Sequence, residues 1–288
     1  MPELPEVESI RIQLEKFIVG HLIEDVTINY SKTLGEEDKK NIIGAKVMGV
    51  RRFGKALVID LSNKFSLAAH VKMTGQFIYQ GPNLKIKPVY TKKVVGGVPG
   101  KHTHIIFKLD RGGILYFNDY RKFGWIRLEK TQELQNSKNP KSFIGKLGKE
   151  FLKDLTGAEF SEILSNSKKP IKLLLMDQEK MAGVGNIYAN EALFLAGINP
   201  RKESKKLGNE EIKNLYEAIH KVLKEGLKYG GASELAYVTP DGTEGNYQNH
   251  TLIYGREGEK CKNGCGSIIK KIKLGGRGTY FCPICQKD

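Results

Sequence analysis

The first residues of the chain, Met1-Pro2-Glu3, are the residue types with the clearest chemical potential. Initiator methionine is normally removed before a small residue, so we expect the mature chain to begin at Pro2. Its α-nitrogen would then be a secondary amine, a nucleophile whose ordinary pKa of about 8 leaves part of it uncharged near neutrality. Glu3 could move a proton during such an attack. Taken alone, the segment favours a plain helix start, since Pro5 and Glu6 suit a first helical turn.

All four cysteines lie near the C-terminus as two close pairs, C-x3-C and C-x2-C, separated by sixteen residues. They are Cys261, Cys265, Cys282 and Cys285. In a reducing compartment, this pattern predicts a zinc site with four thiolate ligands. Two disulfide bonds are the alternative, and they would require a secreted protein.

The segment between the cysteine pairs predicts a β-hairpin. Short apolar runs at 268–274 and 279–281 flank Gly275-Gly276-Arg277-Gly278, which would place Arg277 at the tip. A projecting arginine suits a phosphate or the DNA minor groove, and a solvated surface arginine is the alternative.

The charge of the whole chain indicates a polyanionic partner. The 288 residues carry a formal net charge of +15. Nucleic acid or an acidic membrane surface would fit this excess. Because no apolar run has the length of a membrane span and no signal-peptide core is present, we expect a soluble, cytoplasmic protein that binds nucleic acid.

Several other clusters combine basic residues with turn glycines. Residues 51–55 (RRFGK) end in Lys55, and His70 opens the sequence HVKMTG. Side chains at loop tips can wedge into a base stack, although core packing is the ordinary role of a Met or a Phe. The candidates for such a wedge are Met73, Arg121 and Phe123.

A helical region offers a possible phosphate site. Gly183-Val184-Gly185-Asn186 precedes an apolar helix, and Lys168, Lys169 and Lys172 lie upstream. Glycines before a helix N-terminus let backbone amides approach an anion. A plain turn beside solvated lysines is the alternative.

These residues require a multidomain α+β fold to position them. A helix over 5–18 and short strands predict an N-terminal domain, residues 1–130, of one helix and a β-sandwich. Residues 143–230 are predicted to be helical, and 255–288 to form the zinc unit. We expect a mobile loop at 81–101, a linker at 131–142 and a loop-rich connector at 231–258.

Together, the motifs closely resemble the formamidopyrimidine-DNA glycosylase family of bacterial base-excision repair enzymes. The motifs run through the whole chain: PELPEVE, RRFGK, HVKMTG, DYRKFG, GVGNIYANE, YGREGEKC and GRGTYFCPICQ. The resemblance implies an N-terminal β-sandwich, a helix–two-turn–helix domain and a C-terminal zinc hairpin. It also implies a monomer that acts on damaged double-stranded DNA, excising oxidised purines and cleaving the strand by β,δ-elimination.

The resemblance also assigns roles to residues. Pro2 would attack C1′ to form a Schiff base, with Glu3 as acid/base, Lys55 as a phosphate contact and Arg277 as the finger arginine. Met73, Arg121 and Phe123 would fill the gap left by the flipped base. Further DNA contacts are expected at His70, His102, Lys168, Lys172 and Asn186. Since the electrophile is the sugar, the single zinc, closed by four thiolates, should be structural.

The chain departs from the family pattern in places, and two other functions are conceivable. The first cysteine pair encloses three residues where the family usually has two, and the loop around 85–100 is expected to be longer than usual. One alternative is an endonuclease VIII-like enzyme for oxidised pyrimidines, although PELPEVE differs from that group's usual PEGPE start. The other is a non-enzymatic protein that binds lesions, which the presence of both Pro2 and Glu3 disfavours.

Overall fold

The computed structural model describes residues 1–82, 84, 90–136, 139 and 142–287, and within it the chain forms two compact units. The first unit contains Met1–Lys146 and Tyr229–Gln248, and the second contains Leu147–Lys228 and Asn249–Asp288. Residues 83 and 85–89 of the loop predicted at 81–101, part of the region around 85–100 expected to be longer than usual, lie outside the described residues, as do 137–138 and 140–141 of the linker predicted at 131–142. Among the helices of the described ranges, none is both long and apolar enough to cross a membrane.

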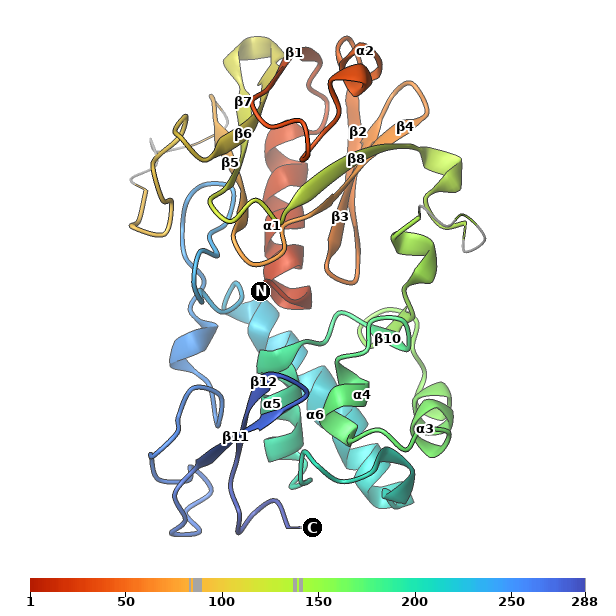
Figure 1. The fold of residues 1–288 in the computed structure, drawn as a ribbon, viewed down its shortest axis with the longest axis vertical. Helices are drawn as coiled ribbons and strands as arrows, with labels where there is room; N and C mark the ends of the chain where they lie inside the picture. The colour runs from red at the N-terminus through yellow and green to blue at the C-terminus, as the bar shows by residue number, and fades with distance from the viewer. Residues whose placement is uncertain (83, 85–89, 137–138, 140–141, 288) are drawn as a thin grey trace. The chain divides into compact units, whose positions relative to one another are not determined.

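The first unit is built on two four-stranded antiparallel sheets (Figure 1). One sheet has the strand order β1-β6-β7-β5, and the other has the order β2-β3-β4-β8. The strands are β1 (Ile23–Ile28), β2 (Val47–Phe53), β3 (Ala56–Leu61), β4 (Phe65–His70), β5 (Gly75–Gln80), β6 (Thr103–Leu109), β7 (Ile114–Asp119) and β8 (Trp125–Lys130). A short helix, α2 (Lys39–Ile42), lies between β1 and β2 in the chain.

Helix α1 (Leu4–Ile18) provides the centre of this unit's core. Its apolar residues recur with the helical period, so they form one buried stripe: Val7, Ile10, Leu14 and Phe17. These side chains belong to one cluster with residues from both sheets. Figure 1 shows α1 running between the two sheets, with its N-terminal end at the start of the chain. The sandwich therefore fixes the position of the N-terminal residues.

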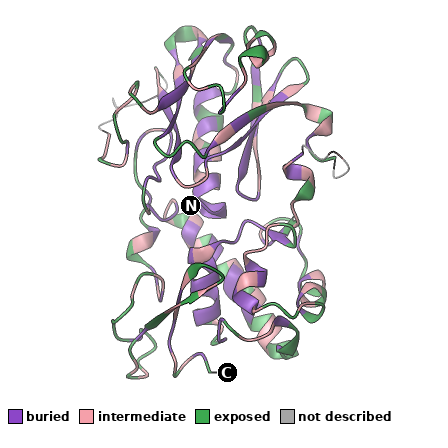
Figure 2. Cartoon of the chain, viewed as in Figure 1, coloured by how far each residue is buried: buried purple, intermediate pink, exposed green. Residues whose placement is uncertain are grey.

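The second unit is mainly helical. Its helices are α3 (Gly157–Ser165), α4 (Ile171–Leu175), α5 (Asn186–Leu195) and α6 (Asn209–Lys228). Helix α5 is buried along nearly its whole length (Figure 2). Gly226 of α6 allows the two helices to approach closely, because a Cβ there would lie 2.5 Å from the Tyr188 ring.

Two small sheets complete the second unit. Strands β9 (Lys149–Glu150) and β10 (Met181–Ala182) pair in parallel. Strands β11 (Lys270–Leu274) and β12 (Arg277–Phe281) form an antiparallel hairpin. Phe194 of α5 joins Ile253, Ile269, Cys261 and Cys282 in one apolar cluster, so the cysteine-containing segment packs on this helix.

The predicted fold class is confirmed, since the structure mixes helices and sheets and gathers the four cysteines near the C-terminus. The connector predicted at 231–258 differs from expectation in one respect. Tyr237 is buried in the core of the first unit, and the Pro240 carbonyl accepts a hydrogen bond from Tyr79 N–H of β5 at 2.7 Å. Residues of this segment thus belong to the sandwich rather than only linking two parts of the chain.

Candidate active site and nucleic-acid interface

The start of α1 holds Pro2 and Glu3 in a fixed, buried position. Glu3 is the N-cap residue of the helix, and its side chain is only 3% exposed. Its backbone N–H donates to Oε2 of Glu6 at 2.7 Å, which satisfies one of the amides left unpaired at a helix start. Because Pro2 directly precedes this cap, its main chain is held at the end of a rigid helix.

Glu6 also connects the helix start to the segment after α6, a role that the sequence analysis did not foresee. Its Oε1 accepts a hydrogen bond from the backbone N–H of Ala232 at 2.7 Å. The Tyr237 hydroxyl donates to the Glu6 carbonyl at 3.3 Å. Gly231 is required beside it, since its φ is +82° and a Cβ there would lie 2.7 Å from Glu6 Cγ. The buried carboxylate therefore sets the position of both segments.

Lys55 shares the surroundings of the N-terminus. It lies in the turn between β2 and β3 and is 5% exposed. Burial lowers the pKa of the Met1 α-amine, nearby Glu3 and Glu6 oppose this, and the Lys55 ammonium lowers it further. Pro2, one residue further along the chain, is itself buried. An amine in such a setting is more often unprotonated and thus nucleophilic.

His70 lies at the end of β4, near the same lysine. It is 4% exposed, and its Nδ1 accepts a hydrogen bond from the backbone N–H of Lys72 at 3.0 Å. Burial, together with the charges of Lys72 and Lys55, lowers the pKa of His70 to about 3. The imidazole is therefore neutral near pH 7, with its proton on Nε2 available for donation.

Buried Asp119 joins the two turns that carry the predicted wedge residues. Its carboxylate accepts hydrogen bonds from the backbone N–H groups of Arg121 at 3.1 Å and Gly124 at 2.6 Å, and from the Thr74 hydroxyl. Thr74 directly follows Met73, so one carboxylate braces both turns.

The wedge candidates themselves are accessible. Phe123 is 57% exposed, Arg121 is exposed and Met73 is half-buried. The Arg121 guanidinium lies 4.9 Å from the centre of the Phe123 ring. Phe123 is therefore not a core residue. An exposed aromatic ring on a turn held by hydrogen bonds is suited to contact a ligand. His102, also half-buried, packs edge-on against Tyr120 at 6.2 Å.

In the second unit, the predicted phosphate contacts differ in accessibility. Lys168 is exposed just before α4, and Asn186 is half-buried at the first position of α5. Lys172 is fully buried, and its Nζ donates to the Gly278 carbonyl at 2.9 Å and to the Thr279 hydroxyl at 2.7 Å. This ammonium therefore fastens the β11–β12 hairpin to α4.

Arg277 is exposed beside the turn of that hairpin, where it pairs with Leu274 across the two strands. Further along β12, Tyr280 N–H donates to Oδ1 of Asn190 at 2.8 Å. The hairpin is thus held by side chains from both α4 and α5. This arrangement confirms that a β-hairpin presents Arg277, as the sequence pattern predicts.

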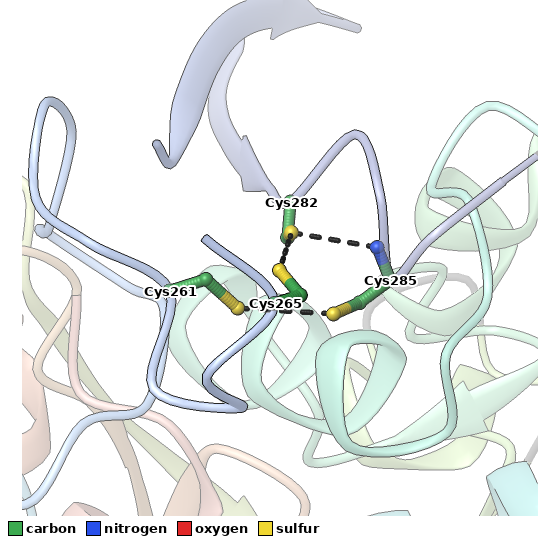
Figure 3. Close-up of side chains that lie close together, drawn as sticks. All are labelled: Cys261, Cys265, Cys282 and Cys285. Carbon is green, nitrogen blue, oxygen red and sulfur yellow. Dashed lines mark hydrogen bonds between the residues drawn. The ribbon is translucent and has the colours of Figure 1, made fainter. Parts of the chain in front are cut away.

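The four cysteine side chains converge on one point (Figure 3). Their Sγ atoms all lie within 4.8 Å of one another. The Cys261–Cys285 and Cys265–Cys282 sulfur distances are 3.8 and 3.5 Å. A tetrahedron with Zn–S bonds of about 2.3 Å has S···S edges of about 3.8 Å. The cluster therefore fits a zinc ion, and the three-residue spacing of the first pair does not prevent the sulfur atoms from meeting.

The thiols do not ionise together without a cation. Burial, together with the neighbouring Cys265 and Cys282, raises the pKa of Cys285 to about 12. Burial would also raise the pKa of Cys282, but the N–H groups of Cys285 and Ile284 hold it at about 6. A divalent cation would supply the positive charge that several adjacent thiolates need.

Glu191 is a further buried carboxylate that the sequence analysis did not identify. It lies on α5 and accepts hydrogen bonds from the backbone N–H groups of Leu252, Ile253 and Tyr254, at 2.7 to 3.0 Å. Burial nevertheless raises its pKa above the ordinary value. The only sequence signal was a charged residue within an apolar helix.

Comparison with family profiles gives a consistent result along the chain. Residues 1–126 match the formamidopyrimidine-DNA glycosylase N-terminal domain, and residues 147–236 match the H2TH domain of the same glycosylase. Residues 258–287 match a zinc finger found in FPG and IleRS.

Individual proteins agree with these matches. A formamidopyrimidine-DNA glycosylase of Desulfitobacterium hafniense is 39% identical over 291 residues, covering 99% of this chain and 100% of the relative. The wild-type Lactococcus lactis Fpg (MutM), in complex with a DNA containing N7-benzyl-Fapy-dG, has a TM-score of 0.86 and 36% identity over 100% of both chains. A MutM structure with DNA containing carbocyclic 8-oxo-G has a TM-score of 0.85 and 36% identity, again over 100% of both chains.

Proposed function

This chain belongs to the formamidopyrimidine-DNA glycosylase family, and on that premise we propose that Pro2 is the nucleophile of a combined DNA glycosylase and AP lyase. Membership makes the protein a DNA glycosylase of base excision repair. Its substrates are oxidised purines, namely 8-oxoguanine and formamidopyrimidines, in damaged double-stranded DNA. The lesions named for the two similar structures support this substrate class.

One observation carries the proposal: a buried carboxylate and a buried lysine lie near the buried residue Pro2, and the pKa of the Met1 α-amine, one residue before it, is lowered. The residues concerned are Glu3 and Lys55, with Glu6 holding the helix cap. Removal of Met1 would convert the nitrogen of buried Pro2 from an amide into a free secondary amine, and burial favours the neutral form of an amine.

The reaction begins when the Pro2 nitrogen attacks C1′ of the lesion nucleotide. A bond forms between this nitrogen and C1′, and the bond from C1′ to the base breaks as the base leaves with a proton. Glu3 then delivers a proton to the ring oxygen, so the sugar opens and a Schiff base remains. The cationic imine acidifies the C2′ proton. Loss of that proton expels the 3′ phosphate, and a second elimination expels the 5′ phosphate.

Access to C1′ requires the nucleotide to leave the duplex, at a cost of a few kcal/mol. Met73, Arg121 and Phe123 replace the lost stacking, with Arg121 facing the orphaned base. Support comes from the exposure of Phe123 and Arg121 and from the Asp119 carboxylate that braces their turns.

The DNA backbone is held by contacts from both units. In the first unit, Lys55, His70 and His102 contact phosphates, and neutral His70 does so by donation from Nε2. In the second unit, Lys168, Asn186 and Arg277 make these contacts. Lys172 positions Arg277, because its own ammonium is used by the hairpin.

Three further statements complete the proposal. The segments 1–130, 143–230 and 255–288 serve as the catalytic, helix–two-turn–helix and zinc-finger domains. Cys261, Cys265, Cys282 and Cys285 bind one zinc ion with a structural role, since four thiolates leave no ligand position for water. The protein acts as a monomer.

The test compares one chain before and after exposure of its N-terminus. The protein is produced with a removable N-terminal extension whose cleavage leaves Pro2 as the first residue. Each form is mixed with an 8-oxoguanine duplex and sodium borohydride, which reduces an imine to a stable amine. We expect a covalent protein–DNA adduct only after cleavage.

The same assay separates the competing functions. Duplexes with an oxidised pyrimidine should be trapped much less, whereas preferential trapping there would indicate endonuclease VIII-like specificity. Binding without any adduct from the cleaved form, together with an uncut strand, would refute the proposed chemistry.

A further inference from the structure

The turn after β4 contains a lysine in a backbone conformation that favours glycine. Lys72 has a φ of +51°, in the left-handed region. A residue with a Cβ is strained in this conformation, whereas a glycine is not. The backbone N–H of Lys72 donates a hydrogen bond to His70 Nδ1. A glycine at this position would form the same bond. A lysine side chain at this place therefore calls for another explanation.

Three aromatic rings beside this turn carry two cationic side chains on their surface. His70, Trp125 and Phe143 pack together with ring centres 5.4 to 6.0 Å apart. The Lys72 Nζ lies 5.8 Å from the centre of the Phe143 ring, and the Arg127 guanidinium lies 4.5 Å from the centre of the Trp125 ring. A cation near the face of an aromatic ring is attracted by the ring's quadrupole. These contacts fix where the charges lie without neutralising them.

The two charges repel each other and have no carboxylate partner at salt-bridge distance. Burial and the nearby charge of Arg127 both lower the pKa of Lys72. In the described ranges of the chain, neither side chain forms an ion pair within 4.0 Å. The charge of Arg127 also acts on the carboxyl group of Glu129. Burial raises the pKa of Glu129, and the nearby Arg127 opposes this shift only in part. The fold thus maintains a pair of like charges beside His70.

We propose that Lys72 and Arg127 form a further phosphate-binding subsite, which holds a backbone phosphate of duplex DNA next to the one at His70. The inference rests on the proposed function, because it adds a contact to the same DNA-binding surface. A phosphodiester would offset the repulsion between the two cations, and its binding would account for a lysine where glycine costs less. The charges of Lys55 and Lys72 both act on His70, so the proposed subsite adjoins the phosphate contacts proposed for Lys55 and His70.

The experiment uses an internal control for backbone strain. Lys64 has a φ of +68° and is exposed in the turn between β3 and β4. Lys72→Gly and Lys64→Gly therefore remove the same charge from the same backbone conformation. Affinity for a duplex with a tetrahydrofuran abasic analogue is measured by fluorescence anisotropy from about 50 to 300 mM KCl, alongside thermal unfolding. The duplex without lesion and a poly-glutamate peptide serve as further probes.

We expect both variants to unfold at or above the wild-type temperature, since each loses strain. Only Lys72→Gly should bind DNA more weakly, by about 3- to 10-fold at 0.15 M salt, with a log–log salt slope smaller by about 1. Lys72→Arg should restore the slope, and Arg127→Gln should lower it as Lys72→Gly does. The loss should be similar with and without the lesion, because a phosphate contact carries no sequence information.

Equal salt slopes for Lys72→Gly and wild type would overturn the inference, as would wild-type binding to poly-glutamate that is as strong as to DNA. Borohydride trapping at saturating DNA distinguishes this failure from that of the proposed function. Trapping by the wild type with an unchanged slope in the variant rejects only the subsite. Absence of trapping in the wild type rejects the Pro2 chemistry, whatever the slopes.

Discussion

His70 is kept neutral by its surroundings, and this makes the stability of the first unit depend on pH. The unfolded chain binds a proton at His70 below about pH 6.5, whereas the folded chain does so only near pH 3. Between these values the unfolded state carries one more proton, so stability rises with pH and falls as the solution is acidified. The stability that depends on unprotonated His70 is complete above about pH 6.5. Below this pH, the free energy of unfolding falls by at most about 1.4 kcal/mol for each pH unit.

The prediction is tested by urea unfolding between pH 7 and pH 5. His70→Asn keeps an acceptor for the Lys72 amide, because an amide oxygen can take the place of Nδ1. We expect the free energy of unfolding of this variant to fall less steeply with acidification than that of the wild type. The exposed His250→Asn variant should keep the wild-type slope. Parallel curves for wild type and His70→Asn would show that His70 is protonated equally in both states.

Buried carboxylates show what could not be read from the order of residues. The chemical roles expected of Pro2, Glu3 and the four cysteines follow from residue type and position in the chain, so these roles can be predicted from the sequence. Glu6 is different, because its partner Ala232 is 226 positions away in the chain. Asp119 likewise joins two turns that only the β-sheet brings together. Such roles depend on tertiary contacts, which neither spacing nor periodicity reports.

At the scale of elements, the strands with clear turn signals were predictable and the others were not. β3 and β4 coincide with the two apolar runs at 56–61 and 65–70, which the turn residues Ser62-Asn63-Lys64 separate. β5 was missed since it begins with Gly75, which reads as part of a turn, and is buried on both faces, so no alternation marks it. The helices of the second unit follow their apolar periodicity, as α6 shows most clearly.

The β11–β12 hairpin depends on a buried lysine, and its rigidity can be tested. Lys172→Met keeps the length and apolar stem of the side chain but leaves the Gly278 carbonyl and the Thr279 hydroxyl without its two hydrogen bonds. An unsatisfied buried polar group costs about 1–3 kcal/mol. We expect faster hydrogen exchange at the amides of β11 and β12, with unchanged exchange in β3 and β4 of the other unit.

Lys169→Met is the matched control, since Lys169 is exposed and pairs with Asp177. Its hairpin amides should exchange at the wild-type rate. If the hairpin amides of Lys172→Met also exchange at the wild-type rate, the hairpin is held mainly by Asn190 and by the cysteine cluster, and Lys172 does not position Arg277.

At the scale of the whole molecule, the excess of positive charge and the two compact units have separate consequences. The net charge of +15 gives attraction to DNA of any sequence, and this attraction weakens as salt rises. The chemistry proposed for Pro2, by contrast, belongs to the start of α1 in the first unit, while the cysteine cluster belongs to the second. Removal of the metal should therefore affect binding and folding of one unit without dismantling the other.

Metal removal tests this separation. Treatment with a thiol-modifying mercurial and a chromogenic chelator should release one zinc ion per chain. Structural zinc sites contribute on the order of 10 kcal/mol of folding free energy in small domains, and residues 258–287 have few buried apolar side chains of their own. We expect their amides to lose protection and DNA affinity to fall strongly, whereas the amides of α1, β3 and β4 keep theirs. Restoration of both by thiol and Zn²⁺, but not by thiol and Mg²⁺, would identify the metal. If protection is also lost throughout α1, β3 and β4, the two units fold as one, and the zinc supports the catalytic N-terminus as well as the hairpin.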